Sequence, residues 1–262
     1  MTGIAKWSVV LAAILFSLGA ATAQAEIKTK AIEYKDGDVS LTGHLAWDDS
    51  LSGKRPGILV VHEWWGLNAH ARERAERLAA EGYVAFAVDM YGTGRVTTEA
   101  DQARAWMTEV RSNPKGWMRR AALGFEVLKG QDRVDPASLG AIGFCFGGTT
   151  VMQMAYAGME FDAVGSFHGS LPAPPEGVTA ITPRVFAAHG RDDSFVPKEN
   201  VTAFQDGLDR IGATWDLAVY SGTRHSFTNP DASQYGIPNV QYNPRADEAS
   251  WAALMRVFDE AF

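Results

Sequence analysis

The only cysteine of the chain, Cys145, lies in the segment Gly143-Phe144-Cys145-Phe146-Gly147-Gly148. This segment has the G-x-S-x-G spacing of a nucleophile elbow, with Cys in place of Ser. The patterns around it predict a buried strand over 139–143 and a helix over 146–156. On such a sharp turn the flanking glycines leave room for a strained residue, and the helix N-terminus stabilises a thiolate. The alternative is an inert, buried cysteine, but the glycines and the strand-then-helix context favour a nucleophile.

Groups that would activate a thiol follow two other predicted strands. The strand over 185–189 leads into Asp192 and Asp193, and the strand over 214–220 leads to His225. Elbow enzymes place nucleophile, acid and histidine in that order, and the chemistry of an open α/β sheet lies at the carboxyl ends of its strands. The order Cys145, Asp193, His225 satisfies this pattern, with Asp192 as the alternative acid.

Two more histidines are assigned from their positions alone. His168 follows another predicted strand and is a candidate for lining the substrate pocket. His70, inside a predicted helix, is expected on the surface.

The elements that must position these groups alternate along the chain. A hairpin is predicted over 27–34 and 39–46, and buried strands over 57–61, 84–88, 139–143, 163–167, 185–189 and 214–220. Helices are predicted over 69–82, 98–111, 114–130, 146–156, 198–211 and 244–262. This alternation predicts an α/β fold with a mostly parallel central sheet covered by helices on both faces. Because no linker or repeat interrupts it, residues 26–262 are expected to form one domain.

Composition excludes several classes of protein. The chain has 262 residues, 46% of them hydrophobic, and a formal net charge of −7, which does not favour nucleic acid or an anionic membrane surface as a partner. One cysteine excludes an intramolecular disulfide and a cysteine-based metal cage. His62-Glu63 begins an H-E-x-x-H zinc pattern, but Gly66 stands where the second histidine is required. The composition therefore fits a globular protein without a bound metal.

The first residues have the pattern of a secretory signal peptide. Lys6 is the only charged residue before Glu26, an apolar run follows it, and Ala23-Gln24-Ala25 is a small-x-small cleavage site. The apolar core is shorter than the roughly 20 residues of a spanning helix, which disfavours an uncleaved anchor. We expect cleavage after Ala25 and a secreted or periplasmic protein that does not stay in the membrane.

Several segments taken together resemble the dienelactone hydrolase (carboxymethylenebutenolidase) family of the α/β-hydrolase superfamily, over nearly all of the chain after the signal peptide. They are the elbow, His62-Glu63-Trp64-Trp65-Gly66-Leu67-Asn68, Asp89-Met90-Tyr91-Gly92, His189-Gly190-Arg191-Asp192-Asp193 with Val196-Pro197, and His225-Ser226-Phe227.

The resemblance implies a catalytic triad of Cys145, Asp193 and His225, because the family's acid is the fifth residue of its His-Gly-x-x-Asp segment. It implies hydrolysis of small esters, thioesters or lactones through an acyl-enzyme, without a cofactor or metal. The alternative is a non-catalytic relative that binds a small ligand in the same pocket. The oligomeric state does not follow from the sequence.

The resemblance also implies supporting groups around the nucleophile. The backbone N–H groups of Trp64 and Phe146 match the family's oxyanion hole. Glu63 matches an auxiliary carboxylate, which implies a contact with Cys145 at rest that substrate binding rearranges.

Specificity is where the sequence departs from the family's namesake. Those enzymes hold a substrate carboxylate with arginines, one of them four residues beyond the catalytic histidine, where this chain has Asn229. An amide carries no charge and cannot form a bidentate clamp. With Trp65, Phe144 and His168 as further candidates for the pocket wall, we expect uncharged substrates to be preferred.

Overall fold

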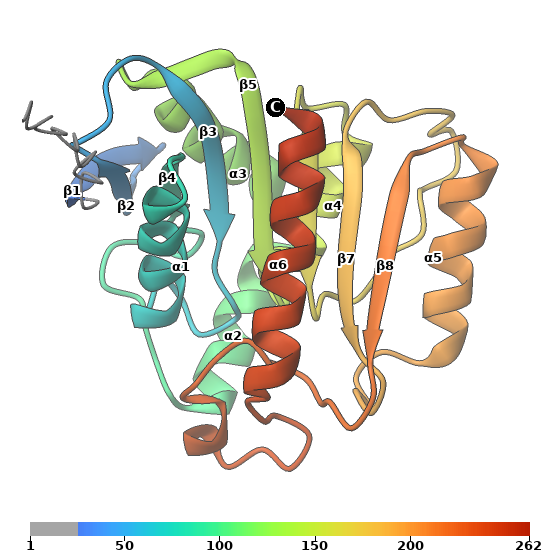
Figure 1. Ribbon diagram of the computed structural model, residues 1–262. Helices are drawn as coiled ribbons and strands as arrows, with labels where there is room; N and C mark the ends of the chain where they lie inside the picture. The colour runs from blue at the N-terminus through green and yellow to red at the C-terminus, as the bar shows by residue number, and fades with distance from the viewer. Residues whose placement is uncertain (1–25) are drawn as a thin grey trace, which may run out of the picture.

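Within residues 26–262, which are those that the structure describes, eight strands form one sheet in the order β1-β2-β4-β3-β5-β6-β7-β8 (Figure 1). Figure 1 shows the computed structural model, and the predicted signal peptide lies outside the described residues. The strands are β1 (Ile27–Asp36), β2 (Val39–Asp48), β3 (Arg55–Val61), β4 (Val84–Val88), β5 (Val134–Phe144), β6 (Ala163–Phe167), β7 (Arg184–Gly190) and β8 (Trp215–Tyr220). Strands β1 and β2 form an antiparallel hairpin, β2 pairs antiparallel with β4, and all other neighbours are parallel.

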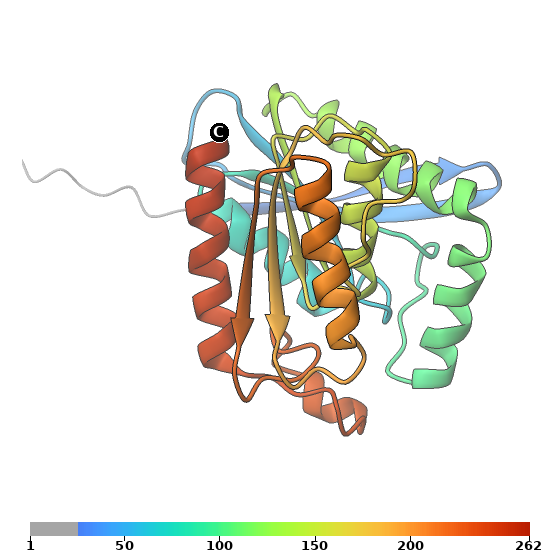
Figure 2. The same ribbon diagram turned by 90° about the vertical axis from the view of Figure 1, so that its right-hand side faces the viewer.

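Helices cover both faces of this sheet. They are α1 (Ala69–Ala80), α2 (Ala100–Arg111), α3 (Pro114–Lys129), α4 (Phe146–Tyr156), α5 (Lys198–Arg210) and α6 (Pro244–Ala261). Figure 2 shows α6 on one side of the strands and α5 on the other. One apolar cluster joins the sheet to α1 and α6, and a second joins it to α3, α4 and α5. The predicted α/β architecture with two covered faces is therefore confirmed.

The inner strands consist almost entirely of apolar residues because neither of their faces meets water. All residues of β4 and β6 are buried, as expected for parallel strands between two helix layers. Strand β5 begins at Val134, earlier than predicted, because its first residues also pair with β3. The register then shifts between Pro56 and Gly57, so residues 136–138 have no partner on β3.

The parallel strands all end at one edge of the sheet, where their arrowheads point in Figure 1. The loops after β3, β5, β6, β7 and β8 therefore meet there. The loop after β8 contains a short 3-10 helix, Ala232–Tyr235, which the sequence patterns did not predict. None of the helices in residues 26–262 combines the length and apolar character that crossing a bilayer requires.

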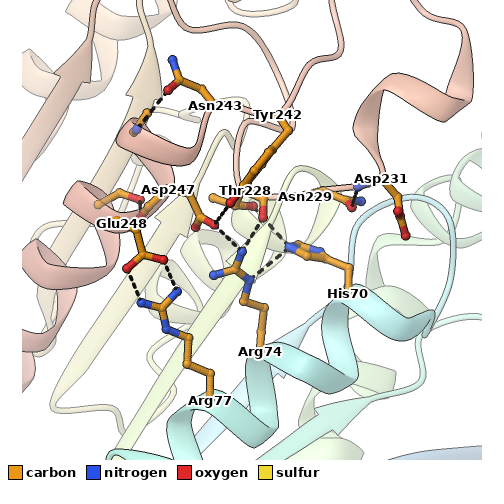
Figure 3. A network of polar contacts seen from close by, with 12 residues as sticks. His70, Arg74, Arg77, Thr228, Asn229, Asp231, Tyr242, Asn243, Asp247 and Glu248 are labelled. Carbon is orange, nitrogen blue, oxygen red and sulfur yellow. Dashed lines mark hydrogen bonds and ion pairs between the residues drawn. The ribbon is translucent and has the colours of Figure 1, made fainter.

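A buried ion pair joins the two helices on one face of the sheet (Figure 3). Arg74 of α1 donates to Asp247 Oδ2 of α6 over 2.8 Å, and it also donates to the backbone carbonyl of Thr228. Its Nε donates over 3.2 Å to Nε2 of His70. His70 is consequently buried, and the expectation that it lies on the surface was wrong, because its ring fills the space between Arg74 and Phe144.

A second pair, three residues further along α1 and one residue further along α6, lies at the surface. Arg77 contacts Glu248 over 2.8 Å, and 66% of the Glu248 side chain is exposed (Figure 3). The two pairs link the same helices and differ mainly in burial.

This difference in burial predicts different effects on stability. Asp247→Asn leaves the buried Arg74 without a counter-charge, so we expect the free energy of unfolding to fall by about 3 kcal/mol. Glu248→Gln, the matched control, is expected to cost less than about 1 kcal/mol because water screens the exposed pair. Urea unfolding followed by tryptophan fluorescence measures both. Equal losses for the two variants would show that burial of the Arg74 pair has no special effect.

Candidate active site

Cys145 occupies a strained turn between β5 and α4. Its φ is 53°, a left-handed conformation that side chains other than glycine rarely adopt. A Cβ on Gly143 would lie 2.1 Å from the carbonyl oxygen of Gly147, and a Cβ on Gly147 would lie 2.1 Å from that of Val61. Both positions therefore require glycine. The turn places Cys145 at the first position before α4, where the backbone N–H groups of the helix are free.

His168 holds the backbone of the turn. The Cys145 N–H donates to the Phe167 carbonyl over 3.0 Å and to Nδ1 of His168 over 3.1 Å. On its other side, Nε2 of His168 lies 2.9 Å from the Thr228 hydroxyl. Burial, aided by the nearby His225, lowers the pKa of His168 well below its usual value. The ring is therefore neutral, accepts from the Cys145 N–H and donates to Thr228.

His225 connects the thiol to a buried acid. Its Nδ1 lies 2.7 Å from Oδ2 of Asp193, and His225 and Cys145 line the same cavity. Asp193 accepts a second hydrogen bond over 2.9 Å from the N–H of Phe195. Asp192, the alternative acid, is exposed, and its N–H donates to the backbone of Thr223. Of the two neighbouring carboxylates, Asp193 is thus the one that contacts the histidine.

His225 and Asp193 each favour the charged form of the other. Burial alone would lower the pKa of His225, but the charge of Cys145 and the hydrogen bond with Asp193 raise it well above its usual value. Burial likewise opposes ionisation of Asp193, yet the hydrogen bond from His225 and the charge of that ring bring the pKa of Asp193 below its usual value. The arrangement therefore favours a protonated His225 beside an ionised Asp193.

Two backbone donors beside the thiol have no acceptor. Trp64 follows β3, and Phe146 is the first residue of α4. Within the described part of the chain, neither N–H donates a hydrogen bond to another protein group. Both residues line the cavity that contains Cys145. Unpaired N–H groups beside a nucleophile are suited to accept the developing charge of an oxyanion.

Glu63 is anchored to the loop that carries His225. The carboxylate is fully buried and accepts hydrogen bonds from the Ser226 hydroxyl over 2.5 Å and from the Asn229 amide over 2.6 Å. Burial raises the pKa of Glu63, and these two donors offset the effect only in part. The resemblance implied a contact between Glu63 and Cys145, whereas in the structure both carboxylate oxygens are bound by Ser226 and Asn229.

A cavity of about 200 Å³ opens beside the thiol, and most of its wall is apolar. It is lined by Trp64, Met107, Arg111, Cys145, Phe146, Thr149, His168, Ser170, Phe195, Val196, His225 and Val240. The expected lining residue His168 is among them. Arg111, at the end of α2, is the one arginine or lysine in this wall.

Three residues expected in the pocket lie outside its wall. Trp65 is fully buried and stacks on Tyr235, with ring centroids 3.9 Å apart. Phe144 faces the opposite side of the sheet, in the apolar cluster beneath α1 and α6. The side-chain amide of Asn229 donates a hydrogen bond to Glu63.

Sequence patterns missed much of the cavity wall. Met107 and Arg111 lie four residues apart, on one face of α2, and this spacing was the signal that they share a surface. Phe195 follows Asp193 closely, and its ring meets the His225 ring edge-on with centroids 5.0 Å apart. Among residues 26–262, no group of three or more His, Cys, Asp or Glu side chains is arranged to hold a metal ion.

The comparisons with known proteins agree with this geometry. The model of the dienelactone hydrolase family matches residues 41–262. Protein usf from Aquifex pyrophilus is 28% identical over 241 residues, which cover 87% of this chain and 97% of that protein.

Two solved structures are similar over almost their whole length. A dienelactone hydrolase-like promiscuous phosphotriesterase from metagenomic libraries is 36% identical with a TM-score of 0.87, and it covers 90% of this chain and 99% of its own. The protein named m3DLH is 38% identical with a TM-score of 0.86 over the same shares.

The family match covers every segment of the site and the sheet from β2 onward. The matches confirm the predicted α/β-hydrolase fold, and they favour an enzyme over a non-catalytic ligand-binding relative. The chain belongs to the dienelactone hydrolase family and is a hydrolase that acts on ester bonds.

Proposed function

We propose that this hydrolase cleaves small esters, thioesters or lactones with Cys145 as nucleophile, His225 as general acid and base, and Asp193 as the orienting acid. The observation that carries the proposal is the hydrogen bond between His225 and the buried Asp193, with Cys145 and His225 in the wall of one cavity. Cys145 stands there on a strained strand-to-helix turn, and most of the cavity wall is apolar. This combination gives a thiol both a base and a place to bind an acyl group.

The reaction has two halves. The Cys145 sulfur attacks the carbonyl carbon, and the oxyanion accepts hydrogen bonds from the N–H groups of Trp64 and Phe146. Collapse expels the alcohol or thiol, which takes its proton from His225, and leaves a thioester on Cys145. His225 then removes a proton from water, whose oxygen attacks the thioester and releases the acid and the thiolate. The raised pKa of His225 suits the first half, because the ring then already carries the proton for the leaving group.

The cavity favours a small uncharged substrate. Its wall is mostly apolar, and its volume of about 200 Å³ admits a short acyl or alcohol group. Asn229 does not reach the substrate because Glu63 holds its amide. The pattern of residues 1–25 further supports export of the enzyme.

Substitution of the proposed nucleophile tests the proposal directly. Cys145→Ala is expected to lower hydrolysis of p-nitrophenyl butyrate by at least about 10³-fold, because no other side chain replaces the sulfur. Cys145→Ser is expected to keep little activity, because a hydroxyl ionises much less readily than a thiol. Circular dichroism of both variants shows whether the fold is intact. A well-folded Cys145→Ala variant with the wild-type rate would remove Cys145 from the mechanism.

The neighbouring carboxylates provide a matched pair for testing the acid. Asp193→Asn is expected to lower kcat by up to roughly 10⁴-fold, the cost of a wrong histidine tautomer in a serine triad. Asp192→Asn is expected to change kcat little, because its side chain is exposed. Steady-state rates with the same ester measure both. A reversed order of effects would assign the acid to Asp192.

Substrate charge provides a further test. We expect kcat/KM for a neutral lactone to exceed that for carboxylated dienelactone of similar size, because the cavity wall is largely apolar. The measurement is made at one ionic strength for the wild type and for Arg111→Gln. A tenfold preference for dienelactone, about 1.4 kcal/mol in the transition state, would contradict the expectation. Loss of such a preference in Arg111→Gln would assign it to the guanidinium.

A further inference from the structure

His62, the residue after β3, is held on both ring nitrogens. Its Nε2 accepts from the Met90 N–H over 3.2 Å, and its Nδ1 contacts the backbone carbonyl oxygen of Glu63. Because a backbone N–H only donates, Nε2 must be the acceptor, so Nδ1 carries the hydrogen and donates it to the Glu63 carbonyl. The ring is fully buried, and its centroid lies 4.9 Å from that of Tyr91.

The carbonyl that His62 binds belongs to the same peptide group as the N–H of Trp64. A peptide group is planar and trans, so its C=O and N–H point in opposite directions within one plane. Fixing the direction of the Glu63 carbonyl therefore fixes the direction of the Trp64 N–H. A donor at the carbonyl also polarises the group and strengthens its N–H as a donor.

The two proposed oxyanion donors differ in how they are supported. The Phe146 N–H is the first of helix α4 and is fixed by the strained turn at Cys145. The Trp64 N–H lies in a segment without regular secondary structure. Only one other group, the Gly66 N–H, donates to the Glu63 carbonyl, over a long 3.4 Å. In the described part of the chain, His62 is thus the only side chain that orients this peptide group.

We propose that His62 is a positioning residue of the oxyanion hole, acting through the Glu63–Trp64 peptide group. It touches neither substrate nor Cys145, and its effect is exerted only when negative charge develops on the carbonyl oxygen. The inference rests on the proposed function, in which Cys145 attacks a carbonyl and the Trp64 N–H stabilises the oxyanion.

Two substitutions of similar size distinguish the effect of losing the hydrogen-bond donor from the effect of losing the ring. In His62→Asn, the amide nitrogen stands at the same distance along the side chain as Nδ1 and still donates to the Glu63 carbonyl. In His62→Leu, this donor is absent. Neither variant can accept from the Met90 N–H as Nε2 does, so that loss is common to both. Should His62→Leu not fold, His62→Ala removes the same donor without adding bulk at a new place.

The expected result is a loss in kcat that only the donor restores. Removing an oxyanion donor costs about 10²–10³ in turnover, so a misdirected donor in His62→Leu should lower kcat for p-nitrophenyl butyrate by at least about tenfold. KM should change little, and His62→Asn should stay within a few-fold of the wild type. Equal losses in the Leu and Asn variants, or no loss in the Leu variant, would overturn the proposal.

A reaction of the thiol that forms no oxyanion separates positioning from general damage. Methyl methanethiosulfonate reacts with the Cys145 thiolate to give a methyl disulfide and methanesulfinate, with no carbonyl involved. Its second-order rate constant should be the same in wild type, His62→Leu and His62→Asn. A fall in parallel with kcat would show that the substitution damages the whole site, and it would also overturn the proposal.

Cys145→Ala, measured in the same assay, distinguishes a failure of the proposed function from a failure of the role proposed for His62. Full turnover in Cys145→Ala would overturn the proposed function itself. Lost turnover in Cys145→Ala together with wild-type turnover in His62→Leu would leave the nucleophile in place and remove only the role of His62.

Discussion

The close approach of α4 to the end of β3 is the constraint on which the site depends. Gly147, in the first turn of α4, lies so near the Val61 carbonyl that a single added carbon would be only 2.1 Å from it. This approach puts the strained Cys145 next to the segment that follows β3. Backbone groups from two separate segments are thereby brought to one cavity. The strain at Cys145 persists because both flanking glycines are enclosed by backbone atoms that cannot yield.

The loop between β8 and α6 has little regular structure, yet buried polar contacts hold it from several sides. Glu63 binds Ser226 and Asn229, Arg74 binds the Thr228 carbonyl, and His168 binds the Thr228 hydroxyl. These contacts come from α1 and from the loops that follow β3 and β6. The position of His225 is therefore set by interactions that are distant in sequence, and this explains how a long loop carries a precisely oriented ring.

The sequence was sufficient to predict the order of the elements, because buried strands and amphipathic helices have clear periods. It was also sufficient to identify the turn at Cys145. Such a turn has no room for a Cβ at the flanking positions, and the spacing of the glycines shows this requirement. It did not predict which face of the sheet receives Phe144, since a strand buried on both faces shows no alternation. Nor did it reveal that His70 is buried, because Thr228, which lies against its ring, is 158 residues away in the sequence.

The histidines at this edge of the sheet show how one residue type takes different protonation states. Burial lowers the pKa of His62, His70, His168 and His189, so that these rings are neutral. The rings of His62, His70 and His168 are held by hydrogen bonds. His225 is as deeply enclosed, but the pKa of its ring is raised because the charge of Cys145 and the hydrogen bond with Asp193 outweigh burial. The charge of Asp193 also raises the pKa of His189. His189 has no hydrogen bond to Asp193, however, and the effect of burial, which lowers this pKa, is larger. Direct contact with an anion, more than proximity to one, therefore decides which buried imidazole carries a proton.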